Sequence, residues 1–595
     1  MTKKISISLV ASFLIATNSH ANTQNLGTIE ISSATKSNQS IKDVTSNVEV
    51  ITGEELEEKN LTTVTEALNL VSGINFTSNG GLGKQTNVYL RGFDSKRVLV
   101  LIDGVRYNDI TSSSGASFDN LMISDIKQIE IIKGSQSGIW GSDASAGVIN
   151  IITKGAELGL HGSILAEYGS FNTKKYNLAT SYKNDKFYFK VNHQKLTTNG
   201  FTAYAARGED INKYEDDGYE NKTTNFKFGI NIDDDNKIDM SHTIIDTYNE
   251  SDSTTADSDA YSLSKTKISS ARFENVNDFA TSELSYSKTD FYRYYPAYGS
   301  TYDGNLDEVS LKSKIDYLNN NSFVIVGGDL KDFEQKDIIN KDYTNKALFL
   351  TNSNKFDKLI LTESIRADKY DAFDDKTTGK IGAKYNITDA FAIFANYGTA
   401  YNVPTLGQLY GAFGPNPNLK PETTKSTDAG FEYMNFKATY FSNKVDDMIE
   451  WSNSKYSNIE GTSKLKGFEL SYGKEIFADT LLGLNYTHLS AKDKDGKNLA
   501  RRPKESLKFG VDYYGFANVH LGLYGEYIGT RYDKADDKGE QTGRYTVINT
   551  VADYTLNKNA KIYAKVDNIT NKYYQSVNNY ATSPRAYYAG IKVSF

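Results

Sequence analysis

The sequence predicts an all-β transmembrane barrel of about 22 antiparallel strands, plugged by an N-terminal α/β domain. The first observation behind this fold class is a change of composition: of 42 tyrosines in 595 residues, only two lie before residue 156. The second is a period-two alternation of apolar and polar residues in segments of about 10 residues beyond that point, as expected of strands with one face in lipid. The third is a mean hydropathy of −0.52 without any apolar run of the ~18–20 residues that a spanning helix needs, which excludes a helical membrane protein.

Composition also narrows the function classes. The chain has no cysteine, which excludes a disulfide scaffold and a cysteine-ligated zinc site. Its net charge of −7 and pI near 5.6 argue against nucleic acid as a partner. The histidines of the mature chain lie singly on separate predicted strands, and no Gly-x-Ser-x-Gly nucleophile turn occurs. We therefore nominate no catalytic residue and do not expect an enzyme.

The first 21 residues show the order of features of a secretory signal peptide. Lys3 and Lys4 precede an apolar stretch over residues 5–16, and Ser19-His20-Ala21 provides a small-x-small cleavage pattern. An ordinary buried helix is the alternative interpretation of the apolar stretch. We assign residues 1–21 to the signal peptide, expect export of the chain, and leave this segment out of the fold.

Residues 40–155 are predicted to form the small α/β domain. A helix is expected to start at Thr52 with an acidic first turn, and a second helix is expected over residues 62–71. Residues 98–102 form a fully apolar run that ends at an Asp-Gly turn, which indicates a buried strand. Further strands are expected over residues 48–51, 126–132 and 148–152.

Residues 156–595 are predicted to form the barrel. Phe187, Phe189 and Val191 alternate with polar residues, and a similar alternation continues to the terminal Phe595. With about 22 strands, each strand and its loop would take about 20 residues, of which ~10 would cross the bilayer. A soluble β-sandwich or propeller is the alternative, but the 7 prolines are few and tyrosine is abundant. A barrel of this width is expected to be filled, and the N-terminal domain is the natural plug.

Several motifs together resemble the TonB-dependent outer-membrane receptors. In the plug these are Val88-Tyr-Leu-Arg-Gly92, Ile129-Glu-Ile-Ile-Lys-Gly134 and Gly147-Val-Ile-Asn-Ile-Ile-Thr-Lys154, and near the C-terminus Val566-Asp-Asn-Ile-Thr-Asn-Lys-Tyr-Tyr574. Residues 397–404, 406–411, 416–422 and 528–534 are similar to the cobalamin-transporter branch of that family. The resemblance implies an outer-membrane location in a Gram-negative cell, a TonB energy-transducing partner, and cobalamin or another large chelate as ligand.

The resemblance also places a TonB box in the linker of residues 22–39. The segment is short and rich in β-forming residues, so it can add as a strand to the open sheet edge of a partner, with alternate side chains in pockets. A disordered linker with a chance β pattern is the alternative. The box residues are Gly27, Thr28, Ile29, Glu30, Ile31, Ser32, Ser33 and Ala34.

Three arginines of the predicted plug, Arg91, Arg97 and Arg106, are expected to dock it inside the barrel. The polar lumen must supply charge partners for them, because an unpaired buried charge is costly. Contact with the ligand is the alternative role for these side chains.

The resemblance to the cobalamin branch implies a set of substrate-binding residues. Those on the plug belong to its apex loops, and those on the barrel to loops in its C-terminal third. Polar, neutral loops suit a large ligand edged with amides, and a solvated loop is the alternative for each residue. Two positions depart from the branch, since Asp536 stands near a tyrosine of that branch and Gln85 replaces an apolar residue. The set comprises Gln85, Asn87, Asp94, Ser112, Ser113, Arg501 and Asp536.

Two predicted extracellular loops carry clustered carboxylates, over residues 209–217 and 246–259. Calcium prefers ~6–8 oxygen ligands from flexible loops, and neighbouring hairpin loops can supply them together. The cobalamin branch binds calcium here, so the resemblance implies calcium as a structural ion, although Thr202 stands where that branch has an aspartate. A solvated acidic surface is the alternative, and no other cofactor is expected. The matching candidates are Glu215, Asp217, Asp252 and Asp259.

We therefore expect TonB-dependent active transport of cobalamin or a related corrinoid across the outer membrane. A ferric siderophore or haem is the alternative cargo for the same machine. A passive porin or an adhesin is the alternative of another class, although a porin needs neither a plug nor a box.

Overall fold

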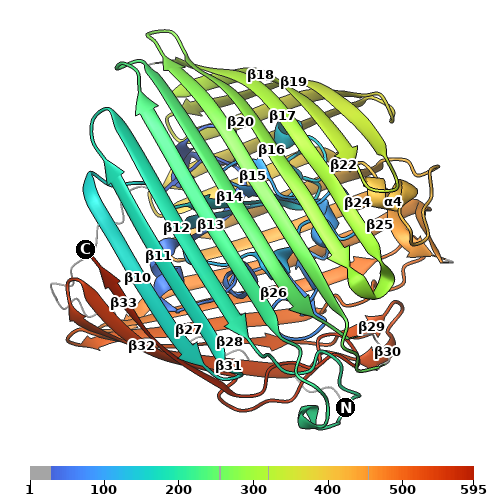
Figure 1. Ribbon diagram of the computed structural model, residues 1–595. Coiled ribbons are helices and arrows are strands. Elements are labelled where there is room, and N and C mark those ends of the chain that lie inside the picture. Colours follow the sequence, from blue (N-terminus) through green and yellow to red (C-terminus); the bar gives the residue numbers. More distant parts are fainter. Residues whose placement is uncertain (1–28, 253–255, 319–320, 453) are drawn as a thin grey trace, which may run out of the picture.

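The alternating side chains of the long C-terminal region close it into a barrel around the N-terminal domain (Figure 1). The computed structural model describes residues 29–252, 256–318, 321–452 and 454–595. Within these residues, 22 antiparallel strands form one closed sheet, which confirms the predicted fold class. β10 (Gly159–Gly169) pairs with β11 (Thr173–Lys183) on one side and with β33 (Ala586–Ser594) on the other, so the sheet has no free edge.

The remaining strands follow one another around the wall in chain order. They are β12 (Phe187–Thr198), β13 (Tyr219–Asn231), β14 (Asn236–Glu250), β15 (Tyr261–Val276), β16 (Thr281–Tyr295), β17 (Ser300–Tyr317), β18 (Ser322–Gln335), β19 (Lys341–Phe356), β20 (Leu359–Tyr370), β21 (Lys376–Thr388), β22 (Phe391–Asn402), β23 (Glu422–Tyr433), β24 (Phe436–Ser452), β25 (Lys455–Phe477), β26 (Thr480–Lys492), β27 (Glu505–Phe516), β28 (Val519–Ile528), β31 (Tyr545–Asn557) and β32 (Ala560–Asp567).

The two ends of the barrel differ in the length of their connections. At one end the strands are joined by tight turns such as residues 184–186 and 434–435, and at the other by long loops such as residues 199–218 and 403–421. Short periplasmic turns and long extracellular loops are typical of outer-membrane barrels, so the long-loop end is the extracellular end. Among the described residues, no helix combines the length and apolar character that crossing a membrane would require.

The plug is built on a five-stranded sheet in the order β3–β8–β9–β6–β7, in which β6 and β9 run parallel. Its bounds agree closely with the predicted strands: β3 (Asn47–Thr52), β6 (Val98–Ile102), β7 (Val105–Arg106), β8 (Ile126–Lys133) and β9 (Gly147–Thr153). The hairpin of β4 (Ile74–Ser78) and β5 (Thr86–Leu90) forms a separate two-stranded sheet. Short helices and 3-10 turns connect the strands: η1 (Ile41–Asp43), α1 (Gly53–Glu58), α2 (Val64–Leu68), η2 (Ser95–Arg97), η3 (Phe118–Asn120) and α3 (Ser137–Trp140).

Helix α2 is shorter than the sequence predicts. The side chain of Thr63 caps its start, and the helix ends at Leu68, with Asn69 as its C-cap, rather than at residue 71. Tight turns continue to Val71, and Gly73, with φ 72°, then directs the chain into β4. Apolar periodicity alone cannot detect this stop, because Val71 is still buried in the core after the helix has ended.

The arginines of the plug dock it against the polar inner face of the barrel. Arg91 pairs with Glu469 at 2.9 Å and Arg97 with Glu422 at 2.7 Å, and all four side chains are at most 3% exposed. Arg106 lies 3.4 Å from Asp143 of the plug and 3.7 Å from Glu308 of the barrel. The predicted docking role of these arginines is confirmed, since each buried charge has a partner.

Candidate functional site

The plug apex and the extracellular ends of the barrel strands enclose a cavity of about 240 Å³. The plug contributes Gln85, from the turn of the β4–β5 hairpin, and residues 111–114. The barrel contributes aromatic side chains from the β16–β17 hairpin, which includes the 3-10 turn η5 (Pro296–Tyr298), from the loop that follows α4 (Leu406–Tyr410), and from the start of β25. These aromatic residues are Tyr295, Tyr298, Tyr302, Phe413 and Tyr456.

Arg293, near the end of β16, links the cavity wall to the plug. Its Nε lies 3.1 Å from Oδ2 of Asp109, and its Nη2 donates a hydrogen bond of 2.8 Å to Oγ1 of Thr111. The guanidinium also lies 5.0 Å from the ring centre of Tyr302. Of the described residues that line the cavity, Arg293 alone carries a charge, and Asp109 balances it. The mouth is therefore a neutral surface of hydroxyl, amide and aromatic groups.

Three of the predicted substrate-binding residues meet in this cavity. Gln85, Ser112 and Ser113 all line it, and the side-chain nitrogen of Gln85 donates to Oγ of Ser114 at 3.2 Å. Asn87 lies two residues further along β5, where it pairs with Thr77 and is not part of the lining.

Three other predicted residues are engaged elsewhere. Asp94 forms ion pairs with Arg97 at 2.8 Å and with Arg502 at 3.7 Å. Arg501 donates from Nε to Asp533 at 2.8 Å, within its own loop region. Asp536 lies in the turn between β29 (Tyr532–Lys534) and β30 (Lys538–Gln541). Its backbone N–H donates to the carbonyl of Asn498, and its carboxylate lies 3.5 Å from the ammonium group of Lys538.

Arg502, rather than its neighbour Arg501, points to the plug. Its Nε donates to the carbonyl of Gly92 at 3.0 Å, and its guanidinium lies 4.7 Å from the ring centre of Tyr89. The resemblance assigned Arg501 from its position along the chain, which does not give the direction of its side chain. The aromatic lining of the cavity was also not predicted from the sequence. Residues 291–302 contain five tyrosines, and this local density could have indicated it.

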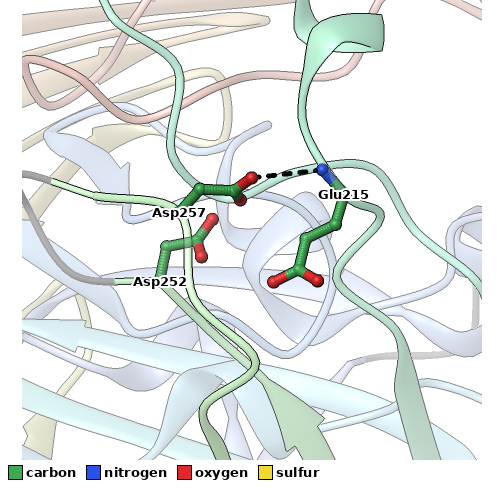
Figure 2. Close-up of side chains that lie close together, drawn as sticks. All are labelled: Glu215, Asp252 and Asp257. Atoms are coloured by element: carbon green, nitrogen blue, oxygen red, sulfur yellow. Dashed lines mark hydrogen bonds between the residues drawn. The ribbon is translucent and has the colours of Figure 1, made fainter.

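The acidic cluster of the two extracellular loops does assemble (Figure 2). Carboxylate oxygens of Glu215, Asp252 and Asp257 all lie within 4.8 Å of one another, and the backbone N–H of Glu215 donates to Asp257 at 3.4 Å. Asp257 was not among the four predicted ligands. Glu215 and Asp257 come from different loops, which follow β12 and β14 respectively.

Asp217 and Asp259, the other two predicted ligands, hydrogen-bond to members of this trio through their carboxyl groups. A hydrogen bond with Asp259 raises the pKa of Glu215 to about 7. Burial, together with a hydrogen bond with Asp252, raises the pKa of Asp217 to about 8. Neighbouring carboxylates repel each other when both are ionised, so one of each pair keeps a proton and hydrogen-bonds to the other. A divalent cation bound between the carboxylates would relieve the same repulsion. The oxygen-only donor set therefore fits calcium.

The described part of the predicted box packs against the plug sheet. Gly27 and Thr28 lie outside the described residues, whereas β1 (Glu30–Ile31) pairs with β2 (Gln39–Ser40). The backbone N–H groups of Ser32 and Ser33 donate to the buried carboxylate of Glu130 at 3.2 and 2.9 Å. Nε1 of Trp140 donates to the carbonyl of Ser33 at 2.8 Å. Ile31 and Ala34 are each 1% exposed, so the segment is packed rather than free.

Comparisons with known proteins agree with this architecture. The family described as "TonB dependent receptor-like, beta-barrel" matches residues 161–569, and "TonB-dependent Receptor Plug Domain" matches residues 40–148. A vitamin B12 transporter, BtuB, of Photobacterium profundum is 28% identical over 602 residues, covering 95% of both chains. BtuB of Vibrio cholerae is 25% identical over 607 residues, covering 97% of both chains.

Solved structures show the same fold. The siderophore receptor PirA of Acinetobacter baumannii superimposes with a TM-score of 0.80 at 17% identity, covering 92% of this chain and 98% of its own. PirA of Pseudomonas aeruginosa gives a TM-score of 0.75 at 18% identity, covering 92% and 99%. At these identities the likeness extends to the fold and not to the ligand.

Proposed function

Because this chain belongs to the TonB-dependent receptors of the outer membrane, we propose that it imports cobalamin or a related corrinoid, driven by a TonB energy-transducing protein. The near-full-length similarity to vitamin B12 transporters supports this cargo. The ligand would bind at the extracellular mouth, between the plug apex and the barrel loops.

The neutral character of the mouth is the observation that carries the proposal. A corrinoid presents amides at its rim and broad apolar faces, which match hydroxyl and amide donors beside aromatic rings. An anionic ferric chelate would instead need cationic groups, and the charge of Arg293 is already paired with Asp109. Gln85, Ser112 and Ser113 would contact the amides, and Tyr295, Tyr298 and Tyr302 the faces.

A ferric catecholate siderophore is the second candidate. Its aromatic rings could stack on the same tyrosines, and displacement of Asp109 would free Arg293 for its negative charge. The two cargoes differ in their dependence on this arginine. Arg293→Gln should weaken binding of a ferric catecholate strongly and binding of a corrinoid only slightly.

The decisive experiment is binding of the purified, detergent-solubilised protein to cyanocobalamin beside a panel of ferric chelates. Tyr298 is 70% exposed and touches no other ring within the described residues, so Tyr298→Ala should leave the fold intact while reducing affinity for the true ligand. Tyr168→Ala is the matched control, because Tyr168 is 61% exposed on β10, away from the mouth cavity. Absence of cyanocobalamin binding, with tight binding of a ferric chelate, would overturn the corrinoid assignment.

Energy input would come through the box. An extended segment adds to a sheet edge through backbone hydrogen bonds, so proline within it removes a donor that the added strand needs. Ile31→Pro should abolish uptake by cells while the purified protein still binds ligand, and Ile31→Val should behave as the parent. Unchanged uptake in the proline variant would refute the role of the box.

Calcium is proposed as a structural ion that joins the two acidic loops. Glu215, Asp217, Asp252, Asp257 and Asp259 would supply its oxygen ligands. The ion would hold the loops near the mouth, and ligand affinity would then rise in its presence. Isothermal titration of ligand with and without calcium tests this, and equal affinities would remove the proposal.

A further inference from the structure

A row of lysines crosses four neighbouring strands on one side of the barrel. The strand register sets Lys425 of β23 opposite Lys444 of β24, Lys444 opposite Lys464 of β25, and Lys464 opposite Lys492 of β26. Side chains that are directly opposite in an antiparallel pair have Cβ atoms about 5 Å apart, and like charges in such positions destabilise the sheet. We refer to these four residues as the lysine row.

The lysine row lies on the outer face of the wall. Its four side chains are exposed, whereas the flanking residues Thr424, Asn443 and Ser463 are at most 2% exposed and point inward. No ion pair or hydrogen bond joins a side chain of the row to any residue in the part of the chain that the structure describes. Asp446, two residues beyond Lys444 on the same face, instead accepts a hydrogen bond from Thr462.

On the wall formed by β12 to β15, lysines on neighbouring strands have acidic partners. There Lys195 faces Lys222, but Glu220 pairs with both of them, at 2.9 Å in the case of Lys195. Lys265 lies opposite Asp246 and pairs with it at 3.3 Å. Cross-strand lysines are therefore neutralised within the protein on that side, and the lysine row is left without such compensation.

The position of the row along its strands suggests what neutralises it. Tyr440 and Phe468 are 55% and 39% exposed on the same outer face, four residues from Lys444 and Lys464 in the direction of the periplasm. Four residues of a strand span about 13 Å. Exposed aromatic rings mark the boundary of the apolar band in outer-membrane barrels, so the lysines lie beyond that boundary at the level of the lipid headgroups.

We propose that the lysine row binds the phosphate groups of an anionic lipid in the extracellular leaflet. Phosphate oxygens would accept hydrogen bonds from several ammonium groups at once, and flexible lysine stems can adjust to the headgroup. A free phosphate ion would meet the same charges but would not reach the exposed rings of Tyr440 and Phe468, about 13 Å further along the strands. The combination of unpaired lysines above exposed rings therefore fits a lipid, whose phosphates and chains occupy both surfaces together.

The test measures lipid binding to the detergent-solubilised full chain by native mass spectrometry, with bis-phosphorylated lipid A as the probe. The double variant Lys444→Gln and Lys464→Gln removes the centre of the row. Each lysine near a charged lipid surface changes affinity about fivefold, so the pair should weaken binding by about 25-fold. The control variant Lys195→Gln and Lys265→Gln removes the same charge from the compensated wall and should change affinity less than about threefold.

Three results would overturn the proposal. One is an equal loss in both double variants, which would indicate only a general charge effect. Another is an unchanged affinity in the row variant while heat-modifiable migration shows an intact barrel. The third is equal displacement of the lipid by inorganic phosphate at matched concentration, which would indicate an ion site. With a lipid A that lacks one phosphate, the row variant should lose less affinity than it does with the bis-phosphorylated lipid. This result would support the proposal, because fewer phosphate oxygens would then contact the lysines.

Discussion

Replacing Glu130 should release the box segment from the plug. The carboxylate is fully buried and accepts backbone N–H bonds from Ser32 and Ser33, as well as the hydroxyl of Ser33. A hydrogen bond to a charged group contributes about 1.5–3 kcal/mol, so loss of the two backbone bonds alone should shift the docking equilibrium by about 3–6 kcal/mol. Since 1.4 kcal/mol is a factor of ten, the undocked population should rise at least ~100-fold in Glu130→Ala.

Thiol labelling can measure this equilibrium, because the chain has no cysteine of its own. A cysteine introduced by Ala34→Cys is buried in the docked state and becomes reactive only when the segment leaves the plug. Asp185→Cys, in an exposed periplasmic turn, gives the labelling rate of a fully accessible thiol for comparison. Glu130→Gln retains one acceptor oxygen and should give a labelling rate between those of the parent and Glu130→Ala.

Two outcomes would refute the reasoning. The parent Ala34→Cys protein could label as fast as the Asp185→Cys control, in which case the segment is not docked in solution. Alternatively, Glu130→Ala could leave the rate unchanged, in which case Trp140 and the apolar contacts of Ile31 hold the segment without help from the carboxylate.

Three further predictions concern the ion cluster, the plug and the mouth. Calcium must displace the protons that Glu215 and Asp217 hold with pKa values of about 7 and 8, so calcium affinity measured by titration calorimetry should fall about 500-fold from pH 8 to pH 6, and a flat profile would exclude these ligands. Among the described residues, Glu469→Ala leaves Arg91 with Asp428 at 3.7 Å as its ion-pair partner, so hydrogen exchange of plug amides should rise by a factor equivalent to about 3–5 kcal/mol, and Arg91→Met with Glu469→Met should recover part of the loss, since Glu469 also pairs with Lys133. Arg502→Ala should reduce ligand affinity more than Arg501→Ala, because Arg502 contacts the plug apex whereas Arg501 pairs with Asp533. A larger loss of affinity in Arg501→Ala would instead support Arg501 as a ligand-binding residue.

Much of the fold could be predicted because it depends on patterns with a fixed period. The run of residues 98–102 is apolar throughout and became the fully buried plug strand β6, and the alternation around Phe187 became an outward apolar face. Side-chain direction within loops has no such period. Arg501 has a φ of 62°, and this local turn sends it to Asp533 while Arg502 reaches the plug. The grouping of Asp257 with Glu215 likewise depends on how two loops meet, which spacing within either loop cannot reveal.

The chemistry of the plug interface explains how a filled barrel can be both stable and able to open. Much of the wall alternates between apolar side chains towards lipid and polar ones towards the plug, as with Phe468 outside and Glu469 inside, although barrel residues such as Phe441 and Leu465 add apolar contacts to the plug core. An apolar contact between plug and wall would lose its full burial energy on separation. A charged contact such as Arg97 with Glu422 loses its partner but regains hydration, so the cost of separation is partly returned by water. Ion pairs of this kind therefore fix the plug in one orientation, and the pull proposed to act through residues 29–34 would wet these contacts while the closed sheet of the barrel stays intact.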